Sequence, residues 1–274
     1  MEKHSIVKHR GNVYLFFLGG LFLLSSASSL YFLKGPIGQY LGREFQMIGI
    51  AAALNQDNPK VLSIIGDYYF SSRGYDIEKA EATYERIIEL DPAFPRAHYQ
   101  LSRIHFIKGG FSEALGEINT ELELYPEYKR SYYIRGLVYG YAGLLDLAIA
   151  DFQTFLEWKP KSWAGHNDLV WVYFQKGDYA EAKAIAMRGL EIAPDNPWLG
   201  NALGVALLNL NEFEAAEAAL EQAARNAEKL TAEEWGAAYP GNDPAIYPEG
   251  LAAMHTSIQE NLKLIEKKLL ERKT

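Results

Sequence analysis

Residues 129–160 read KRSYYIRGLVYGYAGLLDLAIADFQTFLEWKP, and this stretch decides the fold. Apolar and aromatic residues recur at helical spacing before and after Gly143, which is typical of two amphipathic helices. Gly143 can end the first helix because glycine takes the left-handed conformation at little cost. Pro160 closes the stretch because proline cannot continue a helix. The stretch therefore predicts a hairpin of two helices joined by a short turn.

The same pattern repeats along the chain with a period of 34 residues. Three columns keep this spacing, and they are the alanines Ala80, Ala114, Ala148, Ala182 and Ala216, the prolines Pro92, Pro126, Pro160 and Pro194, and the turn residues Gly109, Gly143, Gly177 and Asn211. A fixed period of this length indicates stacked helix hairpins that bury one continuous core.

The alanine column predicts the places where two helices cross closely. Gly66, Gly136 and Gly204 provide a second small residue on the first helix of three hairpins, and Ser102 and Val170 fill the same slot in two others. A larger side chain at such a crossing costs about 1–3 kcal/mol by overpacking.

These features resemble the tetratricopeptide repeat family. The shared pattern is a small residue near the eighth position, tyrosine near the eleventh, alanine at the twentieth and proline at the thirty-second, in five units over 59–228. The usual first-helix tryptophan is replaced, in order, by Leu62, His98, Tyr132, His166 and Gly200. The resemblance implies an all-α fold, a right-handed α-solenoid of about five helix hairpins.

An uncharged segment at 13–33 predicts a transmembrane helix. As a helix it reaches about 31 Å, close to the thickness of the hydrocarbon core of a bilayer. Lys3, Lys8 and Arg10 precede it, so the positive-inside rule places the tail 1–12 in the cytoplasm. We therefore expect a single-pass membrane protein whose repeats lie on the outer, periplasmic side.

A cleaved signal peptide is the competing interpretation of this segment. Small residues at 25–27 would suit the cleavage site, whereas residues 30–33 continue the apolar run beyond it.

The two ends of the array are expected to be covered. Residues 34–58 form a connector in which 40–54 predicts a lone helix that caps the first repeat. Residues 229–274 hold a turn-rich loop and a final helix, whose apolar stripe is Leu251, Met254, Ile258, Leu262, Ile265 and Leu269. Solenoids need terminal helices of this kind because the last core face would otherwise meet water.

Several kinds of chemistry are disfavoured. The chain has no cysteine, which excludes thiolate metal sites and cysteine nucleophiles, and it has no phosphate-binding loop. A net charge of −8 without a basic stripe argues against nucleic acid. His98 and His105 are interpreted as packing residues, and Glu121 and Glu123 as parts of a solvated helix face. We expect no catalytic residue, metal, cofactor or small-molecule substrate.

The inner face of the first helices is the candidate binding groove. By resemblance, peptide-binding members of the family use the second, fifth, ninth, twelfth and thirteenth positions of each unit. The residues so selected are Arg96, Tyr99, Arg103, Arg130, Tyr133, Tyr141, Asn167, Trp171, Trp198 and Asn201. Aromatic rings would supply contact area, side-chain amides would bind a peptide backbone, and arginines would pair with an acidic group.

The sequence therefore predicts a membrane-anchored scaffold or assembly factor that binds a partner protein or an extended peptide through this groove. A second interpretation is that the terminal helix folds back and occupies the groove. A stoichiometric structural subunit of a membrane complex and a self-assembling array are the alternative functions.

Overall fold

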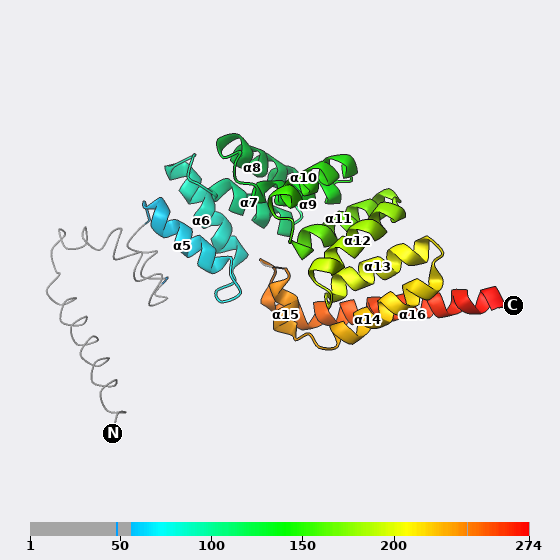
Figure 1. The fold of residues 1–274 in the computed structure, drawn as a ribbon. Helices are drawn as coiled ribbons and strands as arrows, with labels where there is room; N and C mark the ends of the chain where they lie inside the picture. The colour runs from blue at the N-terminus through cyan, green and yellow to red at the C-terminus, as the bar shows by residue number, and fades with distance from the viewer. Residues whose placement is uncertain (1–47, 49–55, 240, 274) are drawn as a thin grey trace, which may run out of the picture.

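The computed structural model describes residue 48, residues 56–239 and residues 241–273. Within these residues the chain is all-helical, and five helix hairpins stack along a curved path (Figure 1). The hairpins are α5 (Pro59–Tyr69) with α6 (Ile77–Leu90), α7 (Ala97–Ile107) with α8 (Phe111–Leu124), α9 (Arg130–Tyr141) with α10 (Leu145–Trp158), α11 (Trp163–Lys176) with α12 (Tyr179–Ile192), and α13 (Pro197–Asn209) with α14 (Phe213–Ala227). A short α15 (Ala232–Ala237), a 3₁₀ turn η1 (Pro244–Ile246) and a long α16 (Tyr247–Lys273) follow.

The close crossings lie where the alanine column predicts them. All five alanines of the column have 0% of their surface exposed. The first helix also comes close to the second at Gly66, because a Cβ added there would lie 2.8 Å from the Tyr84 ring. Ser102 fits in the same slot because its hydroxyl donates a 2.7 Å hydrogen bond to the Ala114 carbonyl oxygen. The small residues therefore set the distance between the two helices of a hairpin.

The turn column is confirmed by the backbone. Its four members have positive φ angles, and these are 79° at Gly109, 77° at Gly143, 82° at Gly177 and 61° at Asn211. Glycine and asparagine tolerate this left-handed region better than other residues, which explains why the column admits only these two types. The first helices of the second to fifth hairpins therefore end within one residue of the same repeat position.

The final helix α16 packs against α14 at the carboxyl end of the array. Ile258 and Ile265 from its apolar stripe are buried in one cluster with Leu220. At the other end, the structure describes only Ile48 from the segment 40–54, and Ile48 is helical and buried against the first hairpin. Core residues at both ends of the array are thus covered by side chains from outside the repeats.

The predicted localisation has to be corrected. The expected membrane helix at 13–33 lies outside the described residues, as does the tail 1–12. Among the residues that the structure does describe, no helix is long and apolar enough to cross a bilayer. The hairpin helices are 11 to 15 residues long, short of the roughly 20 needed, and the longer α16 carries repeated Glu and Lys residues. This finding contradicts a single-pass protein with a periplasmic array.

The close crossings can be tested at Ala148. We expect Ala148→Leu to lower the free energy of unfolding by about 1–3 kcal/mol, because the added atoms have no space between α9 and α10. Urea unfolding of the whole chain, followed by circular dichroism, would measure the loss. Ala150→Leu is the matched control, since Ala150 is exposed on the same helix and should change stability by less than about 0.5 kcal/mol. Equal effects of the two substitutions would contradict this account.

Candidate functional site

The concave face of the array is formed by the first helices of the hairpins. Helices α7, α9, α11 and α13 contact one another in succession and form one continuous row along the array (Figure 1). This concave face holds the residues that the sequence selects for partner binding. The structure brings some of them together, places one in the core, and pairs others with the carboxyl-terminal part of the chain.

A carboxylate lies at the middle of the concave face. Asp168 on α11 accepts a hydrogen bond from the Tyr133 hydroxyl on α9 and a 3.3 Å hydrogen bond from the side-chain amide of its neighbour Asn167. Burial raises the pKa of the Asp168 carboxyl to about 6, and the two hydrogen bonds oppose that rise. Tyr133 and Asn167 were both selected from the sequence, whereas Asp168 was not.

Beside this carboxylate, aromatic rings from three hairpins contact one another. The ring of Tyr141 lies 5.2 Å from that of Phe106 and 4.8 Å from that of Trp171, measured between centroids. The edge of the Trp171 indole packs against α9 where Gly140 has no side chain, since a Cβ at Gly140 would lie 2.5 Å from the indole Cζ3. Tyr141 keeps 57% of its surface exposed. An aromatic surface is therefore available to a partner at this point.

The arginines selected from the sequence have different surroundings. Arg96 and Arg130 are exposed at the starts of α7 and α9. Arg103 lies with its guanidinium 4.6 Å from the centre of the Phe70 ring, and it donates a 2.7 Å hydrogen bond to Gln100. Arg103 is therefore engaged within the protein, while Arg96 and Arg130 present positive charge to solvent.

Tyr99 is part of the core. Only 8% of its surface is exposed, and its ring makes an edge-to-face contact with Tyr128 at 5.1 Å. Tyr99 was selected as a groove residue by its position in the repeat alone. Its side chain is instead buried between the second and third hairpins.

The chain's own carboxyl-terminal loop, residues 238–246, reaches the concave face. The Trp198 indole N–H donates a 2.7 Å hydrogen bond to the Tyr239 hydroxyl. Gly241 has a φ of 102°, and a Cβ there would lie 2.9 Å from the Phe70 ring at the opposite end of the array. The loop therefore contacts both the fifth and the first hairpin.

The final helix also contributes to this contact. The side-chain amide of Asn261 on α16 donates a 3.1 Å hydrogen bond to the Asn201 oxygen. Trp198 and Asn201, two residues expected to contact a partner, are thus already paired with the non-repeating part of the chain. At this end of the concave face, the carboxyl-terminal segment folds back onto groove residues, as the second interpretation of the sequence expects.

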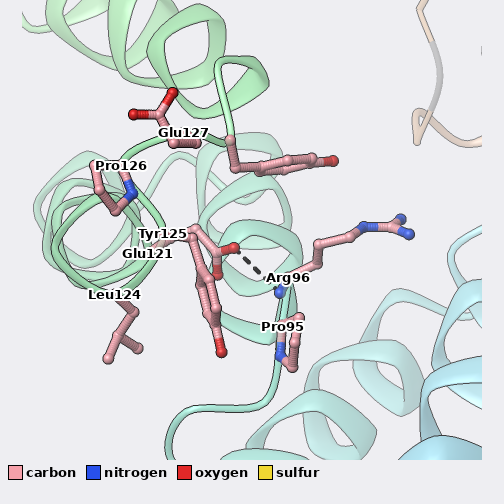
Figure 2. A pocket seen from close by; sticks show the side chains of 8 residues that line it. Pro95, Arg96, Glu121, Leu124, Tyr125, Pro126 and Glu127 are labelled. Atoms are coloured by element: carbon pink, nitrogen blue, oxygen red, sulfur yellow. Dashed lines mark hydrogen bonds between the residues drawn. The ribbon is translucent and has the colours of Figure 1, made fainter.

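A shallow pocket of about 500 Å³ opens between α7 and the loop that joins α8 to α9 (Figure 2). It is lined by Pro95, Arg96, Glu121, Leu124, Tyr125, Pro126, Glu127 and Tyr128. The Arg96 side chain extends away from the other labelled residues of the pocket, whereas its backbone N–H points at Glu121 (Figure 2). The pocket therefore has an apolar wall beside a fixed carboxylate.

The expectation of a solvated Glu121 is wrong. Only 1% of this residue is exposed, and its carboxylate accepts hydrogen bonds from the backbone N–H groups of Arg96 at 3.1 Å and Tyr99 at 3.2 Å. The N-cap residue of α7, Arg96, makes no side-chain capping hydrogen bond. Glu121, which belongs to α8, therefore accepts the hydrogen bonds of the first N–H groups of α7. Burial raises the pKa of the Glu121 carboxyl, and the two donors oppose that rise. Its role is structural.

His98 is likewise held by polar contacts. Its Nδ1 lies 2.6 Å from a Glu117 oxygen and its Nε2 lies 3.0 Å from the Pro92 carbonyl oxygen. The hydrogen bond with Glu117 raises the pKa of His98. Within the described part of the chain, no three His, Asp or Glu side chains gather as metal ligands would.

Family models described as tetratricopeptide repeat match residues 66–129, 141–197 and 177–239. The chain contains tetratricopeptide repeats. The matched residues include α7, α11 and α13 of the concave face, whereas residues 130–140, which hold nearly all of α9, lie between the matches.

Solved tetratricopeptide-repeat proteins have a similar fold. A structure of MamA is 19% identical, with a TM-score of 0.55, over 62% of this chain and 92% of that one. MamA from Desulfovibrio magneticus is 15% identical, with a TM-score of 0.58, over 63% and 96% of the two chains. YrrB, described as a TPR protein with an unusual peptide-binding site, is 19% identical, with a TM-score of 0.54, over 67% and 93%. At such identities the likeness concerns the fold alone.

One curated relative matches a shorter region. An HSP-interacting protein from Zea mays is 34% identical over 92 residues, which are 31% of this chain and 12% of that protein. The chain thus spans about 12% of the length of this relative.

The raised pKa of Asp168 has a consequence for stability. An unfolded aspartate has a pKa of about 3.9, so between about pH 4 and pH 6 the folded state holds a proton that the unfolded state releases. We therefore expect the free energy of unfolding to fall as pH rises through this window. Asp168→Asn should remove part of that fall, because its amide cannot ionise.

Urea unfolding at several pH values would compare Asp168→Asn with the unaltered chain. Glu157→Gln, which replaces an exposed carboxylate on α10, is the matched control and should keep the original pH dependence. Identical pH profiles for all three proteins would show that the Asp168 carboxyl is not perturbed.

Proposed function

We propose that the concave face binds an extended segment of a partner protein, and that the chain is a non-catalytic scaffold or assembly factor. The contact between the carboxyl-terminal loop and this face is the observation that carries the proposal. Tyr239 is hydrogen-bonded there to Trp198, and Gly241 packs against Phe70. A surface that receives one such segment has the shape and the donors to receive another.

The part of the face that the loop leaves exposed supports the same function. Arg96 and Arg130 supply positive charge, and the exposed ring of Tyr141 supplies apolar area next to Trp171. Arginine and aromatic side chains are the types that dominate the energetics of protein interfaces. The peptide-binding site described for YrrB is consistent with such a use of the fold.

Substitutions on the exposed part of the face test the proposal. We expect Tyr141→Ala and Arg130→Ala each to weaken capture of the partner about tenfold or more, because each removes an anchoring side chain of the type found at interface hot spots. Crosslinking pull-downs from native cell extracts, quantified against the unaltered chain, would measure the loss. Both positions are exposed, so thermal unfolding should change little.

Matched controls lie on the second helices. Trp158→Ala removes an exposed aromatic ring from α10, and Arg188→Ala removes an exposed arginine from α12. Capture that falls equally with the controls, or that survives both groove substitutions, would refute binding through the concave face. Capture at a fixed ratio that persists through detergent would instead favour a permanent structural subunit.

A further inference from the structure

The carboxylate of Asp168 lies among aromatic side chains and lacks a basic partner. Its hydrogen bonds come from Tyr133 and Asn167, and no Lys, Arg or His side chain of the described residues forms an ion pair with it. Buried carboxylates are ordinarily paired, since leaving the charge unpaired costs much of its hydration energy. Asp168 is half-buried, on one of the helices that form the concave face.

Aromatic rings approach this carboxylate from three elements. Tyr133 from α9 donates its hydroxyl to Asp168, and Trp171 stands one helical turn further along α11 with Tyr141 packed 4.8 Å from it. The carboxyl-terminal loop adds Tyr239. Burial raises the pKa of Tyr239 to about 12, and the negative charge of Asp168 adds to the rise. The same charge contributes to the raised pKa of Tyr141, after burial.

An anionic centre with aromatic walls suits an organic cation. The faces of tyrosine and tryptophan rings attract ammonium groups, and this attraction is largest where the cation has lost its water. The carboxylate would supply the opposite charge that the protein itself does not provide. A carboxylate ligand would be repelled at this point, although Arg96 and Arg130 could bind one elsewhere on the face.

We propose that Asp168, Tyr133, Tyr141 and Trp171 form a binding site for the ammonium group of a lysine side chain in the partner segment. This inference rests on the proposed function, because it assigns the chemistry of one anchor within the same face. The hydroxyl of Tyr133 and the amide of Asn167 each donate to one oxygen of the carboxylate and hold it in place. Each oxygen keeps a second lone pair that can accept a hydrogen bond from an ammonium group.

The test uses n-butylammonium as the probe, because it reproduces the end of a lysine side chain. The full chain, labelled with ¹⁵N, would be titrated at constant ionic strength while the indole N–H signals are followed by NMR, each signal assigned from a single Trp→Phe variant. We expect the Trp171 signal to shift and saturate. The neutral analogue 1-butanol at equal concentrations should leave it nearly unchanged.

Substitution and pH then identify the carboxylate. Asp168→Asn should weaken n-butylammonium binding about tenfold or more, while Glu157→Gln should leave it unaltered. Lowering the pH from about 7.5 to about 5 should also weaken binding about tenfold in the unaltered chain, because only about a tenth of a carboxyl with a pKa of about 6 stays ionised. Tyr133, Tyr141 and Tyr239, the titratable groups that face Asp168 from α9 and the loop, have raised pKa values and stay neutral over this range.

Equal shifts with 1-butanol, or binding that ignores both Asp168→Asn and pH, would overturn the ammonium site. The pH comparison needs no substitution, so it decides the matter even where Asp168→Asn disturbs folding. Failure of the probe together with loss of partner capture in Tyr141→Ala would reject this inference alone. Probe binding without any effect of the groove substitutions on capture would instead reject the proposed function.

Discussion

The closeness of two helices at each alanine of the 34-residue column is the constraint on which the rest of the structure depends. Ala148 and its four equivalents have no exposed surface, so every hairpin has a close crossing at the same repeat position. Each hairpin also contacts the next, and the first helices come to line one continuous face. The side chains that this face displays are free to vary because they take no part in the crossings.

The repeating part of the fold could be predicted from sequence because its physical causes are local. These helices end at a residue with a left-handed backbone conformation, and glycine or asparagine provides it at the same position of each unit, as Gly143 and Asn211 do. The buried carboxylate was missed although its signal was present. Glu121 stands 34 residues after Ile87 and 34 before Phe155, both buried, so an acidic residue in that column predicts a buried and hydrogen-bonded group. Asp168 stands in register with Ile134 and could have been noticed in the same way.

The contacts of the carboxyl-terminal segment could not be found by this reasoning. Periodicity says where a repeat lies relative to its neighbours, but residues 241–246 lie beyond the matched repeats, and their placement depends on complementarity with distant side chains. Trp198 and Asn201 were therefore selected as free groove residues, whereas the structure pairs them with Tyr239 and Asn261. The family mapping also assumes that equivalent positions have equivalent exposure, which fails for Tyr99.

The reach of the carboxyl-terminal loop from the fifth hairpin to Phe70 of the first alters the mechanics of the array. A linear stack of repeats has two free ends, and its terminal units can fray independently because each touches a single neighbour. Here the loop contacts both terminal hairpins, so unfolding of either end requires the loss of an additional contact. This contact raises the cooperativity of unfolding. It also restrains the curvature of the array.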